Sequence, residues 1–224
     1  MVCMKRCDVV IPVYKSPEWV ELCVYALFQN SDEATLNKVY LINDSEDAFT
    51  KNCLKNLKAK YGDKIVIKQN KENLGFTGTA NRGLRLVTAD YALLLNTDCL
   101  ISKHTIEKLM RHMQTDNRIG LICPISSNAA NLSLDILEGF TYTQMDELLE
   151  ERFAGKMFNA CTVVGNCLMI SKKCLDEVGL LDEIYAPGYG EETDYQFAAM
   201  EKANIIIALG TTVENFAAIE SKYS

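Results

Sequence analysis

The 224-residue chain has only two histidines, and none of its nine cysteines forms a Cys-x-x-Cys pair. An odd number of cysteines, several of them inside apolar segments, fits reduced, buried thiols better than a disulfide framework. His104 and His112 lie on one predicted helix at no familiar metal-ligand spacing, so we expect surface or boundary positions for them. The sequence therefore offers no Ser-His-Asp set and no zinc motif.

Basic residues are also scarce, with 23 Lys and Arg against 30 Asp and Glu, a net charge of −7 and a pI near 5.0. This balance argues against binding of nucleic acid or of an anionic membrane through a basic patch. No apolar run is long enough to cross a bilayer, and no secretory segment precedes the first predicted strand. We therefore expect a cytoplasmic protein without a transmembrane segment, in which an anionic ligand needs local help from a metal ion, a helix N-terminus or a few basic side chains.

The glycine motifs of common nucleotide-binding enzymes are missing as well. Gly75 and Gly78, followed by Asn81, complete neither a Gly-x-Gly-x-x-Gly fingerprint nor the Lys-Ser/Thr end of a phosphate-binding loop. A dehydrogenase and an NTPase are thereby disfavoured.

What the chain does have is a regular alternation of apolar strands and amphipathic helices. Strands are predicted over 9–13, 38–42, 65–67, 91–95, 119–123, 161–170 and 205–208, and helices over 17–29, 47–61, 77–87, 145–153, 172–178 and 191–202, with another helix beginning at Ser102. Such alternation predicts an α/β fold with a mostly parallel sheet and right-handed crossovers. We expect a single domain over 1–224, with halves 1–123 and 124–224, and this domain is compatible with a longer parent protein. The irregular stretch 124–159 is typical of a lid or binding loop.

The most informative strand is the apolar run Tyr91–Leu95, which leads directly into Asn96, Thr97 and Asp98. A strand without polar alternation is expected to be covered on both faces, as in a parallel sheet between helices. Ligands of open α/β sheets bind beyond the carboxyl ends of such strands. The pattern therefore predicts that Asp98 stands at the functional edge of the sheet.

Acidic residues stand at the ends of three predicted elements: Asp44 and Asp98 after strands, and the group Glu191, Glu192 and Asp194 at the start of a helix. Each alone has a structural explanation, as a side-chain turn, a helix-preceding turn, or first-turn acids facing the helix dipole. Together, on one expected face, they indicate a site. One carboxylate with substrate phosphates suffices for Mg²⁺ or Mn²⁺, a second on a loop suits a general base, and Asp44 would accept the imide N–H of uracil or thymine.

Six short motifs follow one another along the chain: Ile11-Pro12-Val13-Tyr14, Asn43-Asp44-Ser45, Asn73-Leu74-Gly75-Phe76, Asn81-Arg82-Gly83, Leu95-Asn96-Thr97-Asp98 and Glu191-Glu192-Thr193-Asp194. This ordered set resembles glycosyltransferase family 2, and most closely its rhamnosyltransferase-like branch. The similarity extends from about Cys7 to Phe216.

The resemblance implies a GT-A fold, with a nucleotide-sugar-binding half at 1–123 and an acceptor and catalytic-base half at 124–224. It implies that Asp98 binds Mn²⁺ or Mg²⁺, and that Glu192 is the catalytic base with Glu191 and Asp194 beside it. The donor-binding residues that we expect are Pro12, Val13, Tyr14, Asp44, Asn73, Gly75, Phe76, Asn81, Arg82, Asn96, Thr97, Asp98 and Gly165. The implied reaction is inverting transfer from a UDP- or dTDP-sugar, such as UDP-glucose or UDP- or dTDP-rhamnose, to a hydroxyl of a glycan or glycoprotein.

Three positions depart from the family pattern. Asn96 replaces the first acid of the Asp-x-Asp motif, Glu192 replaces an aspartate, and Asn215 stands where members often carry a metal-binding histidine. These departures leave an alternative open: a catalytically weak module of a larger protein that binds a nucleotide sugar or a glycan. A nucleotidyltransferase is disfavoured because its Gly-rich, Arg-containing loop is absent after Val13.

Overall fold

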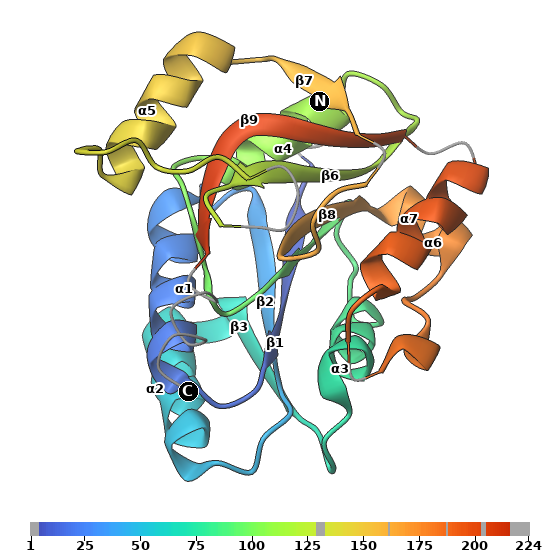
Figure 1. Ribbon diagram of the computed structural model, residues 1–224. Coiled ribbons are helices and arrows are strands. Elements are labelled where there is room, and N and C mark those ends of the chain that lie inside the picture. The colour runs from blue at the N-terminus through green and yellow to red at the C-terminus, as the bar shows by residue number, and fades with distance from the viewer. Residues whose placement is uncertain (1–4, 129–132, 161, 187, 203–204, 216–224) are drawn as a thin grey trace.

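The computed structural model describes residues 5–128, 133–160, 162–186, 188–202 and 205–215. These residues form nine strands, seven α-helices and two short 3-10 turns (Figure 1). The strands are β1 (Cys7–Val13), β2 (Leu36–Asn43), β3 (Ile65–Gln69), β4 (Tyr91–Leu95), β5 (Cys99–Ile101), β6 (Ile119–Ser126), β7 (Met157–Asn159), β8 (Cys167–Ser171) and β9 (Ile205–Asn215). The helices are α1 (Pro17–Asn30), α2 (Ala48–Tyr61), α3 (Gly75–Leu84), α4 (Thr105–Met113), α5 (Tyr142–Phe153), α6 (Lys172–Val178) and α7 (Glu191–Glu201), with the 3-10 turns at Gly62–Lys64 and Glu183–Tyr185.

All nine strands belong to one mixed sheet in the order β3-β2-β1-β4-β8-β6-β9-β5, with β7 pairing β9. The first four strands are parallel to one another, as the pairs Val10↔Tyr40 and Val10↔Leu94 illustrate. β8 runs antiparallel to both β4 and β6, whereas β9 is parallel to β6. The α/β expectation is confirmed, and the parallel half brings the carboxyl ends of β1, β2 and β4 to one edge.

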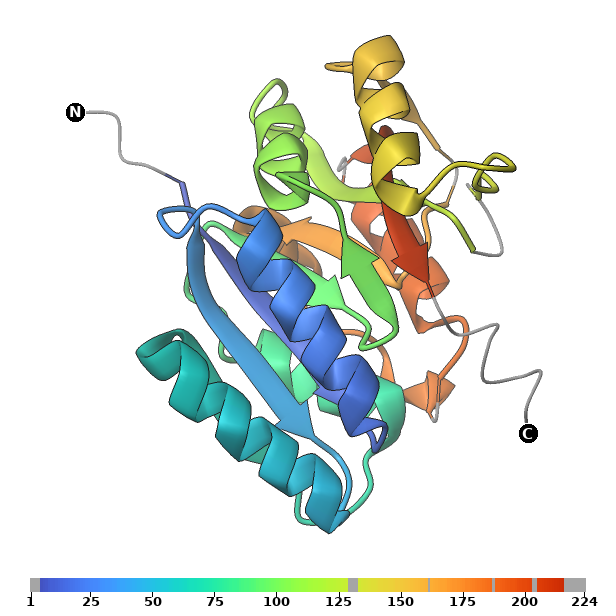
Figure 2. The same cartoon turned by 90° about the vertical axis from the view of Figure 1, so that its left-hand side faces the viewer.

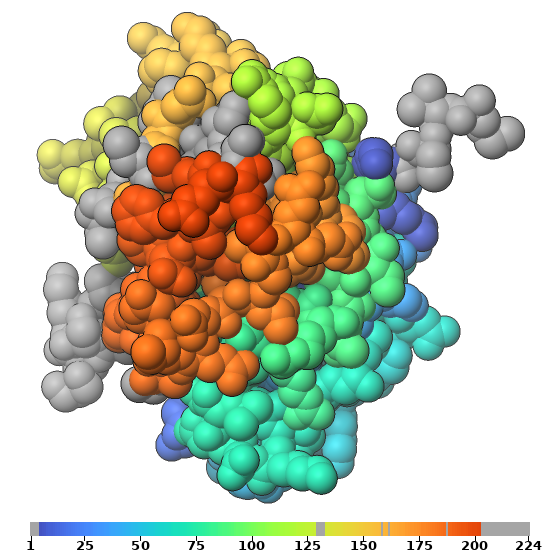
Figure 3. Space-filling model, turned by 90° about the vertical axis from the view of Figure 1, so that its right-hand side faces the viewer, coloured from blue at the N-terminus to red at the C-terminus, as the bar shows by residue number. Residues whose placement is uncertain are grey.

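Helices cover both faces of the sheet and create two hydrophobic cores. α1, α2 and α4 bury apolar side chains against one face, and α3, α6 and α7 against the other. Figure 2 shows α1 and α2 lying across the first face, and Figure 3 shows the orange-to-red segment that includes α6 and α7 beside the teal-to-green segment that includes α3. Leu93 belongs to one core and Leu94 to the other, so β4 is covered on both sides as its unbroken apolar run predicted.

Local sequence signals explain several element boundaries. α1 begins at Pro17, whose fixed φ suits the first helical position, and α2 ends before Gly62, which has φ 58°. α4 begins at Thr105 rather than at Ser102, because His104 adopts a left-handed conformation with φ 60° that interrupts helical geometry. The sequence therefore locates the helices well. It places the start of α4 too early because nothing in the pattern indicates the left-handed conformation of His104.

The strands of the second half differ most from expectation. β8 begins at Cys167 instead of residue 161, which lies outside the described residues, and β9 continues to Asn215 instead of ending at 208. β5 and β7 have three residues each, too short for a periodic signal, and they form because β9 offers a partner edge.

A buried carboxylate near the amino end of β1 connects the parallel strands at the end of the sheet opposite the expected site. Asp8 is fully buried, and its Oδ1 accepts hydrogen bonds from Asn37 Nδ2 (2.8 Å) and Lys38 N (3.1 Å). Its Oδ2 accepts from Thr88 N (2.8 Å) and Ala89 N (3.0 Å). Hydrogen bonds to a charged group are stronger than neutral ones, which offsets the cost of burying the charge. Asp8 thereby ties β1 to β2 and to the segment before β4.

The longest described helices, α1 and α2, have 14 residues each. Within the described part of the chain, no helix is both long and apolar enough to cross a membrane.

Candidate active site

A pocket of about 430 Å³ lies beyond the carboxyl ends of β1, β2 and β4, where the parallel topology gathers the three strand ends. It is lined by Pro12, Val13, Tyr14, Ser16, Trp19, Asp44, Asn73, Gly75, Phe76, Thr79, Asn96, Thr97 and Asp98. All the expected donor-binding residues except Asn81, Arg82 and Gly165 belong to this lining. Their role in donor binding stays a prediction, but the sheet brings together side chains that lie up to 86 positions apart, from Pro12 to Asp98.

Ser16, Trp19 and Thr79 also line the pocket, although none of them belongs to the motifs expected to bind a donor. Trp19 is the only tryptophan of the chain, and it lies in the first turn of the helix that follows β1. A large aromatic residue one turn after a functional strand end was the available signal. Thr79 carried no signal, because only the packing of α3 brings it to the pocket.

Asp44 follows β2 and is almost completely buried, with an exposed fraction of 6%. Its Oδ1 accepts hydrogen bonds from Asn70 Nδ2 (2.7 Å) and from Leu74 N (2.8 Å). This carboxylate therefore holds the 70–74 loop against the strand end while it also lines the pocket. Within the described residues no hydrogen bond involves its Oδ2, which can accept a donor from a ligand.

Asn81 and Arg82 are not among the residues that line the pocket, and both form hydrogen bonds with neighbouring loops. Asn81 Nδ2 donates to Leu181 O (2.9 Å) and to Glu183 Oε1 (3.0 Å), and its Oδ1 accepts from Leu181 N (3.0 Å). Arg82 Nη1 donates to Gln69 O (2.6 Å) and to Asn70 Oδ1. Both side chains therefore hold neighbouring loops in place. This structural role explains why these residues occur here without any contact with a donor.

The turn after β4 presents two oxygen-bearing side chains to the pocket. Asn96 N donates to Asn166 O (2.9 Å), and Asn96 Oδ1 is buried without a hydrogen-bond partner among the described residues. Asp98 follows two residues later, and Cys99 Sγ lies 3.7 Å from its Oδ1. Burial, followed by the charge of Asp98, raises the pKa of both Cys23 and Cys99, so these thiols stay protonated beside the carboxylate.

These two residues suit a hard divalent cation. Mg²⁺ and Mn²⁺ prefer oxygen ligands and usually bind through one or two carboxylates together with substrate phosphates. Asp98 supplies a carboxylate on the pocket wall, and Asn96 on the same wall has a buried amide Oδ1 without a hydrogen-bond partner among the described residues, which an ion reaches once this side chain turns towards the pocket. The backbone pair Cys99↔Asn215 places residue 215 next to this turn, and the side chains of β9 lie outside the described part.

Glu192, in the first turn of α7, lies close to the segment that binds the Asn96 turn. An added Cβ at Gly165 would lie 3.2 Å from both Cβ and Cγ of Glu192, so the glycine leaves room for this glutamate. Gly165 precedes Asn166, whose carbonyl binds the Asn96 turn. The loop before α7 also reaches the pocket, because an added Cβ at Gly188 would lie 3.6 Å from Phe76 Cβ.

The three acids of this first turn have different surroundings. Glu191 is buried with an exposed fraction of 4%, and its Oε2 has no hydrogen-bond partner among the described residues. Burial, with a further contribution from the charge of Glu192, raises the pKa of Glu191. Asp194 N donates to Gly190 O (2.9 Å), and the charge of Asp194 raises the pKa of Tyr185. Glu192 is half-buried, and is therefore more accessible to an acceptor than Glu191.

Comparison with known proteins agrees with this architecture. Residues 8–179 match the family model described as "Glycosyl transferase family 2". No curated protein matches the sequence significantly. The matched range covers the whole pocket lining and ends before α7.

Solved structures share the fold at low sequence identity. The crystal structure of GalNAc-T7 with UDP, GalNAc and Mn²⁺ superposes with a TM-score of 0.76 at 12% identity, covering 96% of this chain and 44% of that chain. The mannosyltransferase PcManGT from Pyrobaculum calidifontis, in complex with GDP-Man and Mn²⁺, gives 0.72 at 11% identity, covering 96% and 57%. S. aureus TarS 1–349 gives 0.70 at 14% identity, covering 94% and 60%. The present chain thus spans about half the length of these structures, which share its GT-A architecture.

Proposed function

The chain belongs to glycosyltransferase family 2, and on this premise we propose that it transfers a sugar from a nucleotide sugar to an acceptor hydroxyl. One observation carries the proposal: the parallel strand ends collect Asp44, the Asn73–Phe76 loop and the Asn96–Asp98 turn around one pocket. The pocket lies where open α/β sheets bind nucleotides.

The proposed donor carries uracil or thymine. Asp44 is held by Asn70 and Leu74 through one oxygen, so its other oxygen is oriented towards a ligand that donates a hydrogen bond. The imide N–H of uracil or thymine is such a donor, whereas neutral cytosine has none at the equivalent ring position. UDP-glucose and UDP- or dTDP-rhamnose are accordingly the first donors to test, for a hexosyl- or rhamnosyltransferase, with Gly165 and Asn166 beside the sugar.

Asp98 would hold Mn²⁺ or Mg²⁺, with Asn96 Oδ1 as a second oxygen ligand. A bound ion supplies Lewis-acid neutralisation of the charge that develops on the departing diphosphate. One protein carboxylate gives a weak site by itself, so the phosphates of the donor must complete it.

Glu192 is the proposed general base. It takes the proton of the acceptor hydroxyl while that oxygen forms a bond to the anomeric carbon and the bond from this carbon to the diphosphate breaks. Attack from the face opposite the leaving group inverts the anomeric configuration. Glu191 and Asp194 fix the first turn of α7 through burial and through its contact with the preceding loop, and thereby position Glu192.

The acceptor is proposed to be a hydroxyl of a glycan or glycoprotein that enters from the 124–224 half. This half carries α7 and the segment that includes α5 and β7. In this proposal the donor binds to the 1–123 half, which provides every residue of the pocket lining.

A release assay tests this function directly. The protein is incubated with Mn²⁺ and, in separate reactions, with UDP-glucose, UDP- and dTDP-rhamnose and GDP-mannose, and the freed nucleotide is measured with and without simple glycan acceptors. We expect UDP or dTDP release by slow hydrolysis, increased by a suitable acceptor. Saturable donor binding without any release would instead support the binding-module alternative, which Asn96 and Asn215 favour. Release from GDP-mannose alone would overturn the role of Asp44.

A further inference from the structure

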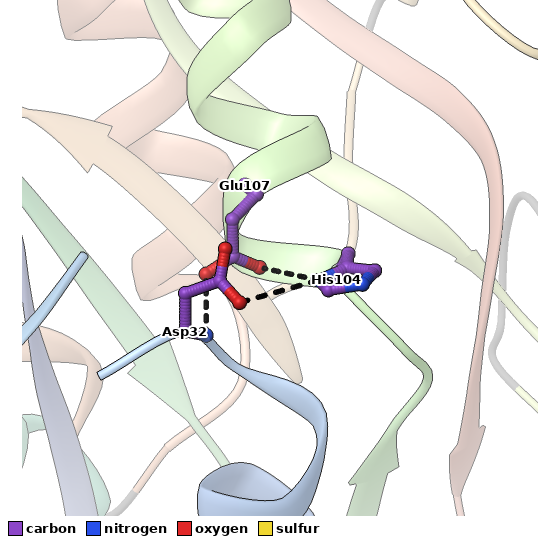
Figure 4. Close-up of side chains that lie close together, drawn as sticks. All are labelled: Asp32, His104 and Glu107. Atoms are coloured by element: carbon purple, nitrogen blue, oxygen red, sulfur yellow. Dashed lines mark hydrogen bonds and ion pairs between the residues drawn. The ribbon is translucent and has the colours of Figure 1, made fainter. Parts of the chain in front are cut away.

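Three side chains that could bind a metal gather far from the pocket, at the other end of α1. Asp32 follows α1, and His104 and Glu107 belong to the start of α4 (Figure 4). Trp19 in the first turn of α1 lines the donor pocket, whereas Asn30 at its last turn accepts a hydrogen bond from His104 N (2.7 Å). A 14-residue helix is about 21 Å long, so the cluster is distinct from the donor pocket.

The spacing of the cluster resembles that of ligands around a cation rather than that of hydrogen-bonded partners. His104 Nδ1 lies 3.8 Å from Asp32 Oδ1 and 3.8 Å from Glu107 Oε2, and one ligand atom from each residue lies within 4.8 Å of the others. Direct N–H···O hydrogen bonds are about 2.7–3.2 Å long. Ligands about 2.1 Å from a tetrahedral ion lie about 3.4 Å from one another, which a small rotation of these side chains reaches.

Glu107 is oriented for this role by its second oxygen. Its Oε1 accepts hydrogen bonds from Asp32 N (2.9 Å) and from Thr35 Oγ1, which fixes the carboxylate plane. Its Oε2 is buried and has no hydrogen-bond partner among the described residues. A buried carboxylate oxygen without a donor is costly, and a cation between Glu107 and His104 removes that cost.

Among the described ion pairs, His104 is the only basic partner of Asp32 and of Glu107. The nearby Lys108 lies 2.8 Å from Glu150 and 3.9 Å from Asp146 instead. The C-terminus of α1 adds partial negative charge, which offsets the positive N-terminus of the shorter α4.

We propose that Asp32, His104 and Glu107 bind one divalent transition-metal ion, with Zn²⁺ preferred. One imidazole and two carboxylates suit Zn²⁺, and Mn²⁺ binds such a set less tightly, whereas Mg²⁺ and Ca²⁺ favour oxygen-only sites. The ion would crosslink the turn after α1 to the start of α4 and leave coordination positions for water. This site is independent of the proposed transfer reaction, because none of its residues lines the donor pocket.

Isothermal titration with Zn²⁺, without any nucleotide, tests the proposal. We expect one ion per chain and a higher melting temperature on Zn²⁺ addition. His104→Asn tolerates the left-handed backbone but cannot reach the ion, so we expect the affinity to fall by about 100-fold or more, beyond the loss typical of indirect ligand partners. Asp32→Asn, at an exposed position, provides a second variant in case His104→Asn fails to fold.

Two controls separate this site from others. Glu33→Gln changes a neighbouring exposed acid outside the cluster, and Asp98→Asn changes the proposed donor-site ligand, so both should bind Zn²⁺ like the unmodified chain. Equal Zn²⁺ affinity in the unmodified chain and in Asp32→Asn would overturn the proposal and point to cysteine thiols. Zn²⁺ binding that requires UDP, or that Asp98→Asn abolishes, would overturn it as well and assign the ion to the donor pocket.

Discussion

Glu192 and Glu191 are adjacent in sequence and differ in environment, which distinguishes the proposed catalytic base from its buried neighbour. Glu191 is buried, and burial raises its pKa, so this side chain favours the neutral form more than an exposed glutamate does. Glu192 is half-buried and packs against Gly165, with no side chain between the two. Only Glu192 therefore combines access to an acceptor with proximity to the Asn96–Asp98 turn.

Replacing Glu192 by glutamine should reduce turnover with little change in donor affinity. Positioned proton transfer contributes about 10²–10⁴-fold to rate, and the amide cannot accept the proton. Glu201→Gln, at the exposed end of the same helix, is the matched control and should retain normal turnover. The measurement is the steady-state rate of nucleotide release beside the dissociation constant for UDP. Undiminished turnover in Glu192→Gln would remove this residue from the base role.

At the scale of elements, α3 positions one wall of the pocket because it packs unusually close to the sheet. An added Cβ at Gly83 would lie 2.3 Å from Val10 Cγ1 and 3.1 Å from Ile42 Cγ1. Glycine is therefore required for this approach between α3, β1 and β2. The same helix carries Gly75 and Phe76 at its start, so its distance from the sheet also sets the position of these pocket residues.

Gly83→Ala should destabilise the protein by about 1–3 kcal/mol, the usual cost of forcing extra volume into a packed core. The loss occurs although alanine is the better helix former, because the methyl group meets β1 rather than solvent. Urea unfolding followed by circular dichroism measures the change. Lys55→Ala, on the exposed face of α2, is the control and should stay within about 0.5 kcal/mol of the unmodified chain. Equal stability of Gly83→Ala would mean that α3 can shift away from the sheet.

The same scale explains which predictions of local structure succeeded. α1 and α2 have strong boundary signals in Pro17 and Gly62, and β4 is an unbroken apolar run, so local sequence sufficed for each. β5 and β7 depend on pairing with β9, which lies far along the chain, and three residues contain no usable period. Short strands of this kind become visible only when their partner is placed.

At the scale of the whole molecule, the proposed metal site is incomplete without the donor. Asp98 is the only carboxylate at the proposed diphosphate position on the described pocket wall, since Asp44 is held by Asn70 and Leu74 at the proposed base end. A divalent ion bound by one carboxylate retains most of its water and depends on further anionic ligands. The nucleotide and the ion should therefore bind cooperatively.

Thermal unfolding measures this cooperativity. UDP with Mn²⁺ should raise the melting temperature by more than the sum of their separate effects, because each completes the other's site and ligands stabilise the folded state through mass action. Asp98→Asn should remove the excess while leaving most of the small effect of UDP alone. The comparison is best made in the His104→Asn background, which removes binding of Mn²⁺ at the proposed second site. Additive shifts in the otherwise unmodified pocket would contradict the shared site.

The candidate pocket was largely predictable, and its surroundings were not. Asp44 and Asp98 follow apolar strands, and the carboxyl ends of parallel strands must meet at one edge, so the pattern alone located them. Asn81 and Arg82 matched a family motif but turned out to hold neighbouring loops. A motif fixes where a residue lies along the chain, whereas the direction of its side chain depends on what packs around it.

The sequence by itself determined the α/β class, the order of the main helices and strands, and the edge at which the candidate chemistry stands, because these follow from local periodicity and from the rules of strand connection. Only the tertiary structure decided which side chains meet. Trp19 at the candidate pocket, Asp8 at the opposite end of the sheet, and His104 beside Asp32 make contacts between segments separated by up to 81 positions, as between Asp8 and Ala89. The contacts of Asp8 and His104 depend on three-dimensional packing, for which the spacing of residues along the chain contains no signal.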